Sequence, residues 1–182
     1  MQMRELEDHF NLGHLTASLV LGQDGNHVDV NGTSKLLGGP ADLELLKYFR
    51  SRSSWVLTTG ATARAERYRI PSKAKLAVLS RQGELALPET LDASEVTVLG
   101  SDFPMSIAST ISHLENMDPG GIHLEFGPQT LLTALAEIDR LQIILSSEYE
   151  TGASNFAEAN NLVLGKSQVV DQLFISQVTG RA

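Results

Sequence analysis

The stretch SWVLTTGATARAERY, residues 54–68, decides the fold of this chain. It opens with an apolar run rich in β-branched residues (55–59), meets Gly60 and continues into a helical pattern. A strand that turns through a glycine into a helix is the building unit of a parallel α/β sheet. Such a turn also aims backbone N–H groups and the positive end of a helix at one point, which suits a phosphate. Gly60 lets the backbone approach closely, and Thr62 can cap the helix or bond a phosphate oxygen.

Two later segments repeat this arrangement. LAVLSR, residues 76–81, ends in Ser80 and Arg81, whose hydroxyl and guanidinium both match the oxygens of a phosphate monoester. HLEFGPQT, residues 123–130, ends a strand at a glycine and starts a helix with Pro128 near its first position. The carboxyl ends of strands in an open α/β sheet form one crevice, where ligands bind. The three segments therefore predict a site for a dinucleotide that carries an extra ribose phosphate.

The rest of the chain continues the alternation of strands and helices. Helical spacing starts at Pro40 and recurs around Ile111 and Leu135. Expected strands cover residues 15–21, 55–59, 76–80, 96–99, 122–126, 140–147, 161–164 and 170–178, the last three without a clear intervening helix. This pattern predicts a three-layer α/β fold with a mostly parallel central sheet of about eight strands and an antiparallel C-terminal portion. We expect one domain over residues 1–182, with residues 1–14 as a mobile or helical arm.

Composition narrows the function classes. The 182 residues carry 14 Lys+Arg against 22 Asp+Glu, a net charge of −8 without a basic run, which argues against a nucleic-acid partner. The chain has no cysteine, so disulfides, thiol nucleophiles and cysteine zinc sites are excluded. Five histidines show no metal-ligand spacing, and we expect no metal. The acidic N-terminus and the lack of a long apolar run predict no membrane contact and a cytoplasmic location.

On these motifs the chain resembles the dihydrofolate-reductase-fold superfamily, and above all the reductase of riboflavin biosynthesis in a stand-alone short form. The resemblance covers roughly residues 16–178. The segment T-A-R-A-E-x-Y is similar to stand-alone reductase-like proteins, and the lack of cysteine fits the absence of the zinc-dependent deaminase of the fused form. The positions that match family motifs are Gly22-Gln23-Asp24-Gly25, Gly32, Ser34, Arg50, Thr59-Gly60-Ala61-Thr62 and Glu125-Phe126-Gly127-Pro128.

The resemblance implies an NADPH-dependent oxidoreductase that transfers hydride to the ribosyl C1′ of an aminouracil phosphate, and a homodimer. It implies Asp24 and Glu66 as the catalytic acids. It implies Ser34, Arg50 and Arg69 around the substrate phosphate. It implies a cofactor site made of Gly60, Thr62, Ala63, Ser80, Arg81, Phe126, Gly127, Pro128 and Thr130, with Ser80 and Arg81 on the 2′-phosphate.

Some positions depart from the family pattern. Glu66-Arg67-Tyr68 stands where the pathway enzyme has a substrate-holding Asp-x-Pro, and Phe126 replaces the first glycine of a Gly-Gly pair. Two alternatives therefore stay open: a reductase of the same fold acting on another carbonyl, imine or pterin, and a catalytically silent cofactor-binding or structural relative. A dihydrofolate reductase proper is less favoured because its expected tryptophan is missing, although Pro40 and residues 42–49 echo its acidic helix. Glu125 lies on a buried strand and must have a partner, since an unpaired buried carboxylate is costly.

Overall fold

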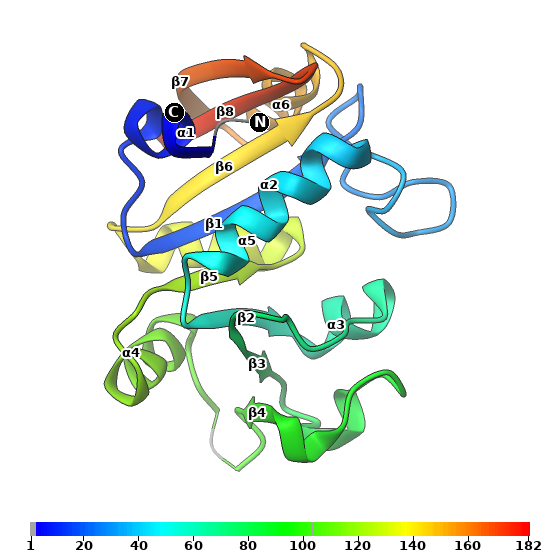
Figure 1. Cartoon of the computed structure of the whole chain (residues 1–182), viewed down its shortest axis with the longest axis vertical. Helices are drawn as coiled ribbons and strands as arrows, with labels where there is room; N and C mark the ends of the chain where they lie inside the picture. The colour runs from blue at the N-terminus through cyan, green and yellow to red at the C-terminus, as the bar shows by residue number, and fades with distance from the viewer. Residues whose placement is uncertain (1–2, 103) are drawn as a thin grey trace. The chain divides into compact units, whose positions relative to one another are not determined.

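The computed structural model describes residues 3–102 and 104–182, which gather into two compact units (Figure 1). The first unit combines the residues up to Tyr48 with residues 142–182, and the second consists of residues 49–141. Each unit contributes four of the eight strands found in the described chain. No helix in these described ranges is long and apolar enough to cross a membrane.

The second unit is built on four parallel strands. Their order is β4 (Val96–Leu99), β3 (Lys75–Leu79), β2 (Trp55–Thr59) and β5 (Ile122–Glu125). The central strand β2 is buried over its first four residues, as expected for a parallel strand covered on both faces. The helices of the second unit are α3 (Gly60–Glu66), α4 (Ile107–Met117) and α5 (Pro128–Glu137), with short 3-10 turns at Gly83–Ala86 and Ala93–Glu95.

The first unit mixes parallel and antiparallel pairing. Strand β1 (Leu15–Leu21) runs parallel to β6 (Gln142–Ser147), whereas β8 (Leu173–Arg181) is antiparallel to both β6 and β7 (Leu162–Val170). Asp171 and Gln172 join β7 to β8 with positive φ angles of 50° and 68°, the backbone that a tight two-residue hairpin requires. Figure 1 draws this hairpin in orange and red. The helices are α1 (Met3–Phe10), α6 (Gly152–Ala159) and α2 (Gly39–Ser51), whose last turn belongs to the second unit.

The predicted fold class is confirmed: an α/β fold with a mostly parallel set of eight strands and an antiparallel C-terminal portion. The strands over residues 15–21, 55–59 and 96–99 have the expected bounds. The expectation of no helix between the last strands is wrong, because α6 separates β6 from β7. The buried face of α6 is mostly alanine and glycine around the single large residue Phe156, so its helical period is faint in the sequence.

The N-terminal segment forms a packed helix. Leu6 and Phe10 of α1 are 1% and 2% exposed, and the Glu7 carboxylate accepts a hydrogen bond from the Tyr48 hydroxyl at 2.9 Å. Lys166 on β7 donates to the backbone oxygen of His9 at 2.7 Å. These contacts pack residues 3–10 against the rest of the first unit as a helix, one of the two expected forms of the arm.

Candidate functional site

The turn from β2 into α3 has the form that the sequence predicts, with one change of role. Thr59 is the N-cap: its hydroxyl accepts a hydrogen bond from the Thr62 backbone N–H at 3.2 Å, and the two threonine hydroxyls lie 3.0 Å apart. The expectation that Thr62 caps the helix is therefore corrected, because the residue before Gly60 has the extended backbone that capping needs. The first N–H groups of a helix have no intrahelical acceptor, so those of Gly60 and Ala61 stand at the mouth of this turn. Ala63 is buried beneath it.

The turn from β5 into α5 lies beside the first one. Gly127 is the N-cap of α5 and Pro128 its first residue, as predicted. A Cβ atom added to Gly127 would lie 4.0 Å from Thr62 Oγ1, and β2 pairs with β5 directly. Thr130 is half-buried in the first turn of α5. Phe126 is 2% exposed, so its ring packs in the interior and only its backbone can face a ligand.

The turn after β3 is stabilised from within. The Ser80 N–H donates to the Leu99 oxygen at 2.8 Å, and the Ser80 hydroxyl accepts from the Gln82 N–H at 3.1 Å. Arg81 is exposed on this turn. Because β3 pairs with β2 in parallel, the turn lies at the same carboxyl edge as Gly60. The role of Ser80 and Arg81 on a 2′-phosphate stays a prediction.

A buried ion pair lies behind these turns. We call Arg50, Tyr68 and Glu125 the Glu125 cluster. Arg50 Nε and Nη2 donate to the two oxygens of Glu125, each at 2.7 Å, and the Tyr68 hydroxyl donates to Oε2 of the same carboxylate. The Arg50 guanidinium also lies 5.6 Å from the centre of the Tyr68 ring. Glu125 thus has the partner that the sequence requires, and it has two of them, Arg50 and Tyr68.

The protonation states of the cluster follow from these contacts. Burial alone would raise the pKa of Glu125, but the hydrogen bonds and charge of Arg50 outweigh it and hold that pKa below its usual value. Burial and the neighbouring Glu125 raise the pKa of Tyr68 well above 10. Burial of Arg50 opposes its charge, yet Glu125 more than compensates and raises the arginine pKa. At neutral pH the cluster therefore holds a carboxylate, a guanidinium and a neutral phenol.

His123 lies two residues before Glu125 and predicts a pH dependence of stability. Its ring stacks on Phe49, 4.6 Å between centres and 2° from parallel, and burial lowers its pKa from 6.5 to about 4. Between these values the unfolded chain binds more protons than the folded one, so stability falls as the pH falls from 6.5 towards 4. We expect a loss of about 3 kcal/mol over this window. Urea unfolding at several pH values measures it.

The control for this prediction is the exposed His14. His14→Gln should leave the pH dependence unchanged, whereas His123→Gln should flatten it between pH 6.5 and 4, because it removes the group that titrates. An equal slope in wild type and His123→Gln would show that His123 does not control acid stability.

The remaining predicted residues are divided between the units. Asp24 is exposed in a turn where the Gly25 N–H donates to the Gly22 oxygen at 3.1 Å, and Ser34 is half-buried further along the same loop; both belong to the first unit. Glu66 ends α3 half-buried and Arg69 is exposed, both in the second unit. The structure brings Gly60, Thr62, Ala63, Gly127 and Pro128 together, and it joins Arg50 to Glu125. The roles predicted for Asp24, Ser34, Glu66 and Arg69 stay predictions.

One further acid is not among the predicted site residues. Asp42 lies in the first turn of α2, and its Oδ1 accepts a hydrogen bond from the Ser146 hydroxyl at 2.6 Å. Ser146 is 1% exposed on β6, and Gly38 is needed nearby because a Cβ there would lie 2.3 Å from the Asp42 Cβ. The aspartate could be noted as a helix-start residue, but its partner lies 104 positions away and no local pattern links them.

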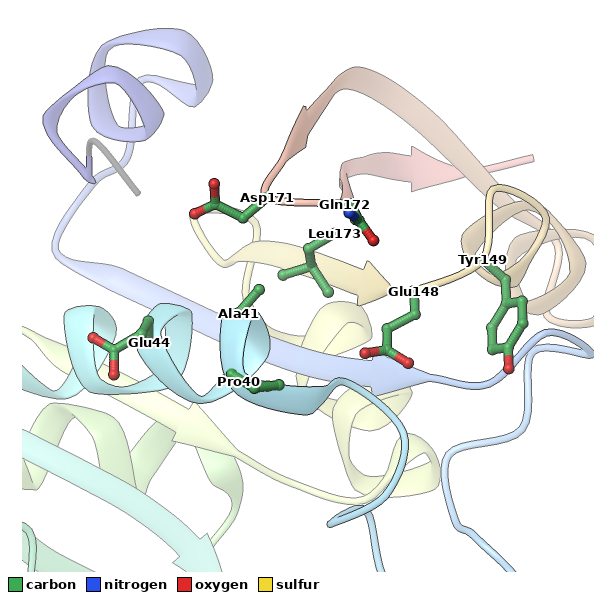
Figure 2. A pocket seen from close by; sticks show the side chains of 8 residues that line it. All are labelled: Pro40, Ala41, Glu44, Glu148, Tyr149, Asp171, Gln172 and Leu173. Carbon is green, nitrogen blue, oxygen red and sulfur yellow. The ribbon is translucent and has the colours of Figure 1, made fainter.

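The first unit also contains a cavity of about 630 Å³ beside the start of α2 (Figure 2). It is lined by Pro40, Ala41, Glu44, Glu148, Tyr149, Asp171, Gln172 and Leu173. Three of these lining residues are acidic, one each from α2, the loop after β6 and the β7–β8 turn, and none is a lysine or arginine. This charge disfavours a phosphorylated ligand. In the part of the chain that the structure describes, no three His, Cys, Asp or Glu side chains are grouped so that they could hold a metal ion.

Comparison with known proteins finds solved structures with a similar fold. No protein-family model matches the sequence, and no curated protein matches it either. A deaminase/5-amino-6-(5-phosphoribosylamino)uracil reductase of Thermotoga maritima is 16% identical, with a TM-score of 0.62; the match covers 92% of this chain and 56% of that one, so this chain spans little more than half of it. A riboflavin biosynthesis reductase of Saccharomyces cerevisiae is 9% identical, with a TM-score of 0.67 and coverage of 98% and 99%.

A dihydrofolate reductase of Enterococcus faecalis, solved in complex with NADP(H), is 13% identical, with a TM-score of 0.55 and coverage of 92% and 96%. At these identities the likeness shows the fold alone: the chain has the dihydrofolate-reductase-like α/β fold that these structures share.

Proposed function

We propose that this chain, which has the fold of the riboflavin-pathway and dihydrofolate reductases, is an NADPH-dependent reductase. One observation carries the proposal: the β2–α3 and β5–α5 turns lie side by side, with Gly127 facing Thr62. Two adjacent helix starts aim their N–H groups and positive ends at one place, which is the chemistry that a pyrophosphate needs. The cavity at α2 is surrounded by carboxylates and does not compete for this ligand.

The residues of the second unit fit the cofactor. Gly127 has no side chain, and the nearest described atom beyond its chain neighbours is 4.0 Å from where a Cβ would lie, so a ligand can approach its backbone. Gly60, Thr62 and Ala63 would hold the pyrophosphate on one side, and Gly127, Pro128 and Thr130 would hold it on the other. Ser80 and Arg81 would meet the 2′-phosphate. When bound, NADPH supplies the hydride, and the chain's own residues orient the acceptor and supply a proton.

The leading acceptor is a ribosyl aminouracil phosphate, as in the Thermotoga maritima neighbour. In this proposal Arg50 and Arg69 of the second unit bind its phosphate, and Glu66 of the same unit supplies the proton. Half-burial of Glu66 at the end of α3 and partial exposure of Arg50 support their parts. The homodimer is also a proposal. Strand β7 is an edge strand and exposes Val163 and Val169, the apolar surface that such a contact would cover.

A second acceptor class is favoured by Asp42. A half-buried carboxylate that is oriented by a buried serine can accept two parallel N–H bonds from an amino-substituted ring. Pterins and related aminopyrimidines carry such a pair of donors. This observation supports reduction of a pterin-like heterocycle as the alternative, and tight binding of an antifolate together with its loss in Asp42→Asn would favour it over the ribosyl phosphate.

Fluorescence titration with NADPH and NADH tests the cofactor. We expect NADPH to bind at least about tenfold more tightly than NADH, a difference of about 1.4 kcal/mol. Arg81→Ala should remove most of this preference by weakening NADPH and leaving NADH unchanged, because only NADPH carries the 2′-phosphate. Arg140→Ala, in an exposed ion pair with Glu115, is the matched control and should change neither affinity. If the wild-type protein binds neither cofactor, the proposal is wrong.

A further inference from the structure

The Glu125 cluster places charged groups in a largely buried position, where removal from water is unfavourable. Glu125 is 6% exposed, and replacing a buried ion pair by apolar side chains is often neutral or stabilising. Stability alone is therefore a weak reason for the cluster. A second reason is found in where its members come from: Arg50 from the end of α2, Tyr68 from the segment after α3, and Glu125 from the last position of β5. All three meet at the edge that carries the candidate site.

The two halves of the ion pair differ in exposure. The Arg50 side chain is 25% exposed and Glu125 only 6%. Glu125 takes the Nε and Nη2 side of the guanidinium, which leaves Nη1 outside this pair. An arginine has five N–H donors in a rigid plane, so a carboxylate that grips one edge fixes the direction of the others. Thus a buried residue orients a partly exposed one.

The carboxylate is itself held in place. The Tyr68 hydroxyl donates to Glu125 Oε2, and the backbone oxygen of Glu125 accepts from the Thr58 hydroxyl at 2.7 Å. The Tyr68 backbone oxygen in turn accepts a hydrogen bond from the Thr90 hydroxyl at 2.5 Å. Each member of the cluster is therefore tied to a second element, and the guanidinium has little freedom to rotate.

We propose that Glu125 and Tyr68 are positioning residues that hold Arg50 ready to donate to the phosphate of the acceptor. This inference rests on the proposed function, in which Arg50 binds that phosphate. Neither Glu125 nor Tyr68 touches the ligand. Glu125 reduces the net positive charge at the site, so its contribution is the orientation of the fork, and preorganised donors bind more tightly because less freedom is lost.

Inorganic phosphate is the probe, and the rise of Tm with phosphate at constant ionic strength, in the presence of saturating NADPH where it binds, gives an apparent Kd. Each variant is referred to its own phosphate-free Tm, so a loss of stability alone does not change the result. We expect Arg50→Lys to weaken phosphate binding about tenfold, and Glu125→Gln and Tyr68→Phe about threefold or more. Arg140→Lys, in an exposed Arg–Glu pair, should have no effect.

The opposite outcomes are as informative. If charge and not orientation controls the site, Glu125→Gln will bind phosphate more tightly than wild type, and the inference is overturned; an unchanged Kd in both Glu125→Gln and Tyr68→Phe, or no phosphate binding by wild type, overturns it as well. Should Glu125→Gln not fold, Tyr68→Phe still decides. Wild-type protein that binds phosphate at Arg50 but no NADPH would refute the reductase proposal and leave the positioning role intact.

Discussion

Replacing Glu125 with alanine should lower the free energy of unfolding by about 3–5 kcal/mol. The substitution leaves the buried part of the Arg50 guanidinium without its bidentate partner and the Tyr68 hydroxyl without its acceptor. An uncompensated buried charge costs more than the intact pair contributes, because the water that solvated it in the unfolded chain is not restored. Urea unfolding at neutral pH measures the change as a shift of midpoint.

The chain provides a matched control in the Arg140–Glu115 pair. These side chains are joined at 2.7 Å, as Arg50 and Glu125 are, but they are 54% and 33% exposed. Glu115→Ala should cost about 1 kcal/mol or less, since water takes over the solvation of the arginine. A double variant, Glu125→Ala with Arg50→Met, should recover part of the loss because it removes the stranded charge. Equal losses in Glu115→Ala and Glu125→Ala would show that burial of the Glu125 cluster has no energetic consequence.

Replacing Gly127 with valine should weaken NADPH binding at least about tenfold, while the protein stays folded. Gly127 has φ of −65° and ψ of 161°, values that any residue adopts, so the backbone itself is not strained. The added Cβ would lie 4.0 Å from Thr62 Oγ1, and the two methyl groups beyond it would occupy the space between the two helix starts. Forcing a ligand past added methyl groups in a fitted site costs about 1–3 kcal/mol.

Two variants make this test specific. Gly127→Ala adds only the Cβ, which has room, and should weaken NADPH binding less than valine does. Gly180→Val on β8 adds the same side chain at a glycine whose Cβ would meet no described atom within 4 Å, and NADPH affinity should not change. A modest loss of stability, about 1 kcal/mol, is expected for Gly127→Val because valine is a poor N-cap residue. Unaltered NADPH affinity in Gly127→Val would remove the adjacent turns from the cofactor site.

The parts of the fold that could be predicted are those whose signal is local. The strand Trp55–Thr59 is a continuous apolar run that ends at a glycine, and Pro128 after Gly127 marks a helix start, so both turns of the candidate site are predictable. The requirement that Glu125 have a partner follows from the cost of burying a carboxylate. The identity of that partner does not follow from the sequence, because Arg50 and Tyr68 lie 75 and 57 positions away from Glu125.

The misses have physical causes as well. Thr59 and Thr62 are both threonines at the start of one helix, and only the backbone angles decide which is the cap. Helix α6 has one large apolar residue, Phe156, so its helical period is weak beside the strands that flank it. The hydrogen bond from Ser146 to Asp42 joins two elements far apart in the chain, and it depends on the pairing of β6 with β1. Contacts of this kind exist only once the sheet is assembled.

The split of the first unit along the chain has a consequence for biosynthesis. Strand β1 leaves the ribosome before residues 49–141, and its partner strand β6 leaves after all of them. The two strands pair in parallel, with Ser18 opposite Ile144. The four strands of the second unit are contiguous in that inserted segment and can pair while translation continues. During this period β1 lacks its partner strand β6. A nascent chain arrested before residue 142 therefore lacks the partner strand of β1, and it is the form that chaperones and proteases should recognise.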